Sequence, residues 1–211
     1  MRNSYKYQIS NPEIFKEKLF FWAEKWNNFC ILNSNGYKNN PYSKYDFIAA
    51  FGNNKNTKIS ENPFEEIKQF HNDNRDWSFG FFGYDLKNFT ENLKSENIDG
   101  IKAPDYYFFI PEFVYIIEEN ELEIQYSDQY TSVIESMIYE IENTQIIEKP
   151  VNIEIIKSRI SKEDYLKAVS DIKQHIQLGD IYELNFCQEF YAENTEIKPL
   201  DLYLNFELCI F

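Results

Sequence analysis

Apolar residues recur at helical spacing in four stretches of the chain, which predicts four helices. "NPEIFKEKLFFWAEKW" starts at Asn11, a candidate N-cap, and has Pro12 in its first turn. "NPFEEIKQFHND" has the same Asn-Pro opening, and "SVIESMIYEIEN" has an amphipathic pattern. "SKEDYLKAVSDIKQHIQLGD" begins at Ser161 and reaches Gly179, where a left-handed stop is expected.

Shorter apolar or alternating runs between these stretches predict strands. The runs are "NFCILNS", "FIAAFG", "WSFGFFGYDL" and "GDIYELNFCQEF", the last of which spans Gly179 to Phe190. "FVYIIEENELEIQYS" has two alternating halves around Glu119 and Asn120, the pattern of a β-hairpin. Strands and helices are intermixed and at least one strand pair is antiparallel. The predicted fold class is therefore α+β, with antiparallel sheets flanked by helices.

The stretch from 143 to 160 loses helical periodicity and contains Pro150. It is interpreted as a connector with one edge strand at most. The predicted organisation is a first region at 1–142, a connector at 143–160 and a second region at 161–211.

Composition narrows the function classes. The chain has 211 residues, a formal net charge of −14 and 18% aromatic residues. Strong acidity argues against a general nucleic-acid binder and against an anionic membrane surface, both of which require positive charge. The start has no apolar signal core and no apolar run is long enough to span a bilayer, so a cytoplasmic location is expected.

Motifs that carry catalysis or metal binding are missing from the sequence. The three cysteines form no CxxC pair, and two histidines do not by themselves make a metal site. No P-loop, GxSxG, HExxH or dinucleotide fingerprint is present. No catalytic residue and no metal ligand is therefore named on this chain.

One polar loop has the composition of a small-ligand site. "ILNSNGYKNNPYSKYDF" places Ser34 after a strand and continues through Tyr42, Ser43, Lys44 and Tyr45. Hydroxyl groups can bond an ammonium or a carboxylate, aromatic faces can cover a ring, and the lysine can meet a carboxylate. An ordinary surface loop of turn residues has the same composition, so residue types alone leave both interpretations open.

Three segments in order resemble the chorismate-utilising enzymes. They are the loop just described, "WSFGFFGYDLKN", and "SKEDYLKAVSDIKQHIQLGDIYELNFCQEFYAEN". The motifs "PYSKYD" and "GFFGYDL" resemble component I of aminodeoxychorismate synthase more than they resemble the related component I of anthranilate synthase. Glu183 departs from the glutamine that is usual in the third segment.

The resemblance implies a two-sheet α+β fold, of which this chain is the N-terminal half. It implies magnesium-dependent exchange of the 4-hydroxyl of chorismate for an amino group, for para-aminobenzoate and folate synthesis, with ammonia from a glutamine amidotransferase partner subunit. It also implies a tryptophan pocket, lined here by Ser34, Tyr42, Ser43, Lys44 and Tyr45.

The family's catalytic and magnesium-binding residues lie further toward the C-terminus than this sequence reaches, so the chain alone is expected to be inactive. The ending "LDLYLNFELCIF" follows the family as far as Asn205. The Ser-Pro-x-Pro-Phe-like segment that helps to close the pocket does not follow, so truncation or a reading-frame error is expected. Two alternatives stay open: a fragment of anthranilate synthase component I, and a non-catalytic domain that binds an aromatic amino acid.

Overall fold

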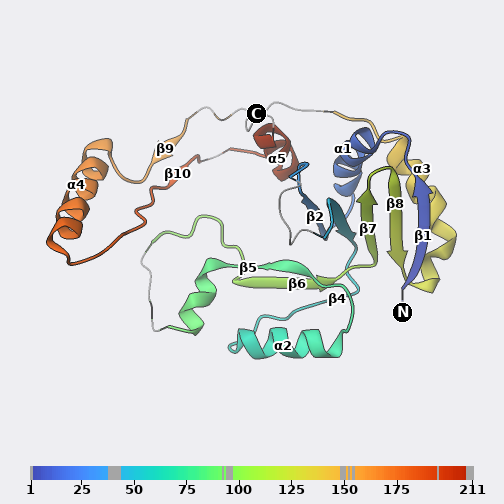
Figure 1. Cartoon of the computed structure of the whole chain (residues 1–211), viewed down its shortest axis with the longest axis horizontal. Helices are drawn as coiled ribbons and strands as arrows, with labels where there is room; N and C mark the ends of the chain where they lie inside the picture. Colours follow the sequence, from blue (N-terminus) through green and yellow to red (C-terminus); the bar gives the residue numbers. More distant parts are fainter. Residues whose placement is uncertain are drawn as a thin grey trace. The chain divides into compact units, whose positions relative to one another are not determined.

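The computed structural model describes residues 2–37, 44–91, 93, 97–147, 151, 153, 155–193 and 195–207. The chain forms two compact units, Met1–Ile147 and Glu148–Phe211, hereafter unit 1 and unit 2 (Figure 1). The elements of unit 1 are β1 (Asn3–Gln8), α1 (Pro12–Ala23), β2 (Phe29–Asn33), β3 (Phe47–Phe51), β4 (Lys55–Asn56), α2 (Pro63–Asp73), β5 (Phe79–Phe82), a 3₁₀ helix at Tyr84–Phe89, β6 (Tyr106–Ile110), β7 (Phe113–Glu118), β8 (Glu121–Tyr126), a second 3₁₀ helix at Asp128–Val133, and α3 (Ile134–Glu142). Those of unit 2 are β9 (Lys157–Ser158), α4 (Lys162–Leu178), β10 (Phe190–Tyr191) and α5 (Pro199–Glu207).

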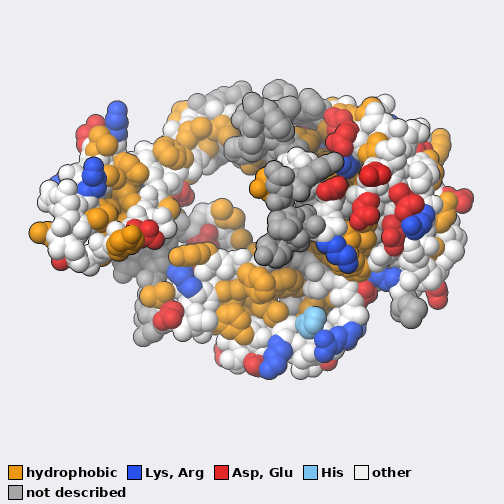
Figure 2. Space-filling view, viewed as in Figure 1, with side chains coloured by type: hydrophobic (Ala, Val, Ile, Leu, Met, Phe, Trp, Pro, Cys, Tyr) orange, Lys and Arg blue, Asp and Glu red, His pale blue; other side chains and the backbone are white. Residues whose placement is uncertain are grey.

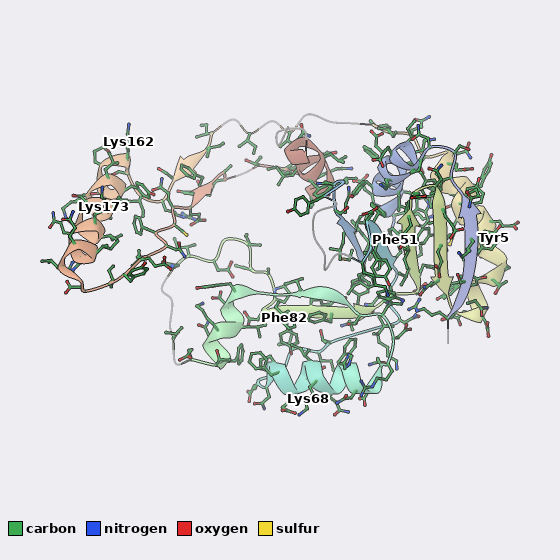
Figure 3. The ribbon with its side chains drawn as sticks, viewed as in Figure 1. Tyr5, Phe51, Lys68, Phe82, Lys162 and Lys173 are labelled. Atoms are coloured by element: carbon green, nitrogen blue, oxygen red, sulfur yellow. The ribbon has the colours of Figure 1, made fainter. Side chains whose placement is uncertain are left out.

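A five-stranded antiparallel sheet in the order β1-β8-β7-β3-β2 organises unit 1. The predicted β7–β8 hairpin is present, and its turn holds Glu119 at φ 51°. Helices α1 and α3 cover one face of the sheet (Figure 1). Phe51, which Figure 3 labels, packs in this layer with its ring 5.1 Å from that of Trp22 and 5.2 Å from that of Tyr115. This layer is the main apolar core.

A second sheet, in the order β4-β6-β5, packs beside the opposite face of the large sheet. Both of its pairings are antiparallel. Gly80 lets β5 lie close to β6, because a Cβ there would stand 1.9 Å from the carbonyl oxygen of Tyr107. Helix α2 runs alongside this small sheet (Figure 1).

The predicted helix caps are confirmed at three places and wrong at one. Asn11 accepts a hydrogen bond from Ile14 N at 3.2 Å, and Ser161 accepts one from Asp164 N at 3.0 Å. Gly179 ends α4 at φ 83°, as expected. Asn62 makes no capping bond to α2, because its backbone, at φ −120° and ψ 73°, lies outside the extended geometry that directs a cap side chain at the first turn.

In unit 2 the expected strand from Gly179 to Phe190 is largely wrong. Among the described residues only Phe190 and Tyr191 pair, with Ser158 and Lys157 of β9. A strand persists only where a neighbouring strand completes its backbone hydrogen bonds, so the preceding residues remain irregular. Phe186 instead stacks on Tyr165 of α4, with ring centroids 5.3 Å apart.

Antiparallel sheets with helices beside them confirm the α+β class. The division at 1–142, 143–160 and 161–211 stays a prediction. No helix among the described residues has the length and apolar character needed to cross a bilayer.

Candidate functional site

The space between the two sheets of unit 1 holds an aromatic and aliphatic cluster that forms the base of the candidate site. Its buried members come from four strands, and four half-buried side chains pack against them. The buried residues are Ile48, Ala50, Phe79, Phe109, Val114 and Ile116, and the half-buried ones are Cys30, Tyr45, Trp77 and Tyr107. The half-buried set is where a ligand could contact this cluster, because among the described residues those side chains reach its surface.

A tight turn places Ser34 at the end of this cluster. Asn35 and Gly36 have φ of 50° and 73°, and Tyr37 N donates to Ser34 O at 2.9 Å. Two positive φ values in succession define a type I′ turn, which favours the Asn-Gly pair found here. Ser34 N also donates to Asp46 O at 2.8 Å, so the turn is fixed beside the residue that precedes β3.

The Ser34 hydroxyl is the clearest sign of a ligand in this region. Its oxygen is buried and has no hydrogen-bond partner among the described residues. A buried hydroxyl without a partner costs about 1–3 kcal/mol. Such a cost is tolerated where a bound molecule supplies the missing bond, because binding then removes the penalty.

Lys44 and Tyr45 supply charge and an aromatic wall next to this turn. Lys44 Nζ lies 5.0 Å from the centre of the Tyr45 ring. A hydrogen bond with Tyr45 raises the pKa of Lys44 further above its ordinary value, which already lies well above neutral pH. The Tyr45 ring in turn lies 5.9 Å from that of Trp77. A cation and two rings at one place suit an aromatic molecule with a carboxylate.

The Tyr107 hydroxyl and the Cys30 thiol are polar groups that stay uncharged. Tyr107 Oη donates to Asn28 Oδ1 at 2.7 Å, and burial raises the pKa of Tyr107. Burial also raises the pKa of the Cys30 thiol. These groups shape the site and offer hydrogen bonds, while Lys44 carries its positive charge.

The structure thus brings together three of the five predicted site residues: Ser34, Lys44 and Tyr45. Tyr42 and Ser43 lie outside the described residues. Sequence reasoning missed Trp77 and Tyr107, which reach the site from the α2–β5 connection and from β6. The signal that could have found them is the aromatic content of "DWSFGFFGYD" and "DYYFFI".

The described part of the chain contains no metal centre. No group of three or more His, Cys, Asp or Glu residues there is arranged to hold a metal ion. The magnesium implied by the family resemblance therefore does not fit the described residues, and no step is derived through it. The two histidines contact Arg75 and Asp180 on the surface.

Comparison with known proteins bears on both units. Residues 28–208 match the family described as chorismate binding enzyme. The chain belongs to the chorismate binding enzyme family. The resemblance inferred from the three ordered segments is thereby confirmed. The protein is therefore a member of a chorismate-utilising family.

Curated relatives are similar at low identity. Aminodeoxychorismate synthase component 1 of Bacillus subtilis (strain 168) is 23% identical over 141 residues, covering 60% of this chain and 29% of that protein. Anthranilate synthase component 1 of Acetivibrio thermocellus is 25% identical over 214 residues, covering 86% and 43%. Aminodeoxychorismate synthase component 1 of Escherichia coli (strain K12) is 22% identical over 191 residues, covering 78% and 42%.

A solved structure has the same fold. Anthranilate synthase component I from Streptococcus pneumoniae TIGR4 superposes with a TM-score of 0.56 at 18% identity, over 86% of this chain and 45% of that one. The chain therefore spans less than half the length of the chorismate binding enzymes to which it is similar. The predicted correspondence with part of the two-sheet fold is confirmed.

Proposed function

We propose that this chain corresponds to the N-terminal portion of component I of an aminodeoxychorismate synthase. The whole protein would replace the 4-hydroxyl of chorismate with an amino group, using ammonia from a glutamine amidotransferase subunit, for para-aminobenzoate and folate synthesis. The observation that carries the proposal is the family match over residues 28–208. The segments "PYSKYD" and "GFFGYDL" favour the aminodeoxychorismate branch, as does the likeness to two relatives of that name.

The share of this chain in that function is a scaffold with an amino-acid site. We assign tryptophan binding to Ser34, Lys44 and Tyr45, and the sequence pattern adds Tyr42 and Ser43. The unpartnered Ser34 hydroxyl offers a hydrogen bond to the ligand. The Lys44 ammonium suits the carboxylate, and the rings of Tyr45 and Trp77 suit the indole.

Turnover of chorismate by the 211-residue chain tests the first proposal. Chorismate, ammonium and magnesium are incubated with the purified chain, and products are separated by chromatography. We expect no 4-amino-4-deoxychorismate above an enzyme-free control, because the described residues form no group arranged to hold a metal ion. Formation of that product by the chain alone would refute the assignment of catalysis to other residues.

Anthranilate synthase component I is the second candidate, favoured by the relative that aligns over 86% of this chain and by the solved structure. The genes next to the coding sequence separate the branches. An aminodeoxychorismate lyase gene supports the first candidate, and genes of tryptophan synthesis support the second.

A free-standing amino-acid sensor is a further alternative, supported by the Ser34 site alone. As a sensor, the chain would be a monomer that binds tryptophan tightly without other subunits. Light scattering combined with calorimetry examines this directly.

A further inference from the structure

An open cavity of about 640 Å³ lies in unit 1, away from the Ser34 turn. It is lined from β1 and β8 on one side and from β4 and the α2–β5 connection on the other. Three cationic and two anionic side chains line it, so it carries a positive balance in a chain whose net charge is −14. Figure 2 shows basic side chains near the C-terminal end of α2, whereas acidic ones predominate over the large sheet.

Arg2 provides a fixed positive charge in this cavity. Its side chain is 9% exposed, and its Nε donates to Asp76 Oδ1 at 2.8 Å. Nη1 donates to Glu112 O at 3.0 Å, and Nη2 donates to Pro111 O at 2.5 Å. The described residues supply no second acceptor for Nη2, so one guanidinium N–H remains for a bound anion.

Charged groups of both signs line the cavity. Lys55 Nζ donates to Asn74 Oδ1 at 2.9 Å and keeps further N–H groups. On β8, Glu123 Oε1 accepts from Ser4 Oγ and from Gln125 Nε2, both at 2.9 Å. Its Oε2 has no donor among the described residues. Arg2 and Lys55 therefore offer cationic N–H donors to the cavity, and Glu123 offers a carboxylate oxygen.

Trp77 separates this cavity from the tryptophan site. Its Nε1 donates to Gln125 Oε1 at 2.7 Å on the cavity side, and its ring packs 5.9 Å from Tyr45 on the other side. The indole holds the cavity wall in place and is a fluorophore whose surroundings change when the cavity fills.

We propose that this cavity is a second binding site, which takes a small zwitterionic molecule with a carboxylate and an ammonium group. The carboxylate bonds Arg2 Nη2 and Lys55, and the ammonium bonds Glu123 Oε2. The volume falls in the range of about 300–1,000 Å³ that is typical of small-molecule sites. The site is independent of the proposed chorismate chemistry and of Ser34.

Calorimetry with the 211-residue chain and three probes tests the proposal at millimolar concentrations. L-Glutamine presents both charges, succinate presents only carboxylates, and 1,4-diaminobutane presents only ammonium groups. We expect saturable binding of L-glutamine, accompanied by a change in tryptophan fluorescence, and weaker binding of the other two. Absence of saturable L-glutamine binding, or succinate binding of equal strength, would overturn the proposal.

Charge variants locate the site. Lys55→Met and Glu123→Gln should each weaken L-glutamine binding about tenfold, the effect of one lost charge-assisted bond. Lys68→Met is the matched control, since Lys68 points away from the small sheet on α2 (Figure 3) and does not line the cavity. It should leave binding unchanged, as should Ser34→Ala. If Ser34→Ala weakens L-glutamine binding as much as Lys55→Met does, the probe occupies the tryptophan site and the proposal fails.

Discussion

Ser34→Ala is the sharpest test of the tryptophan site, because it should change stability and affinity in opposite directions. The hydroxyl is buried without a partner in the described part of the chain. Removing it removes a penalty of about 1–3 kcal/mol, less a small loss of packing. We therefore expect the free energy of unfolding without ligand to rise by about 1 kcal/mol. With a urea slope of about 2 kcal/mol/M, the midpoint should rise by about 0.5 M.

The same substitution should weaken tryptophan binding. The ligand loses one hydrogen bond to the hydroxyl, which corresponds to about a tenfold higher Kd. Calorimetry measures the affinity, and tryptophan fluorescence follows urea unfolding. All three tryptophans, Trp22, Trp26 and Trp77, belong to unit 1, so the fluorescence reports on the unit that holds the site.

Thr57→Val is the matched control, since it also deletes a buried hydroxyl of unit 1. Thr57 is 5% exposed, and its Oγ1 accepts from Phe108 N at 3.0 Å. Its loss leaves that amide unpaired, so the unfolding free energy should fall by about 1 kcal/mol with tryptophan affinity unchanged. The reasoning is refuted if Ser34→Ala also lowers stability and leaves the affinity as it was, for then the hydroxyl has a structural role.

Three further predictions concern the scaffold. Tyr115→Phe should raise the unfolding free energy by about 1 kcal/mol, since the buried Tyr115 Oη has no partner among the described residues. Tyr107→Phe should lower it by a similar amount, because the Tyr107 hydroxyl donates a hydrogen bond to Asn28. Urea titration compares the two variants. Gly80→Ala should lower the unfolding free energy by about 2–4 kcal/mol, because the new Cβ would meet backbone atoms of β6. Gly100→Ala should change stability little, because there is open space at that position. A thermal melt in which both variants behave alike would contradict this. Hydrogen bonds from a lysine and a tryptophan near the end of α1 lower the pKa of Glu140, so its contribution is present at neutral pH and is lost as the pH falls below the ordinary value of 4.5. Glu140→Gln should therefore reduce the acid sensitivity of unfolding, by less than about 1 kcal/mol because the pair is exposed.

Elements whose signals are local could be predicted from the sequence. The start of α1 depends on Asn11 and Pro12, and the end of α4 depends on Gly179; each acts within a few residues. The β7–β8 hairpin is similar, because its strands alternate around a two-residue turn.

Elements that depend on distant partners could not be predicted in this way. β1 is mostly exposed although tyrosines alternate with polar residues along it, and it is a strand because it pairs with β8 more than a hundred residues later. β6 has the sequence "YYFFI", a continuous apolar run without strand periodicity, and it is a strand because it pairs in register with β5. The stretch before Phe190 shows the reverse case, in which side chains alternate but no strand of the described residues pairs with it.

The residues of the candidate site also divide into those with a local sequence signal and those that depend on distant contacts. Ser34, Lys44 and Tyr45 belong to one continuous motif, so residue types and spacing indicated them. Trp77 lies just before β5 and Tyr107 lies in β6, and the packing of the small sheet on the large one brings both to the cluster. Predicting them would have required the contact between the sheets, which no local pattern carries.

The two ligand proposals and the proposed enzyme function can be separated experimentally because their residues are distributed differently. Ser34, Lys44, Tyr45 and the residues of the cavity all lie within Met1–Ile147, whereas the family match extends to residue 208. If the chain is a scaffold with an amino-acid site, it should bind tryptophan and should not turn over chorismate. Turnover without tryptophan binding would mean that the buried hydroxyl and the adjacent rings are only packing, and that residues outside the described set perform the chemistry.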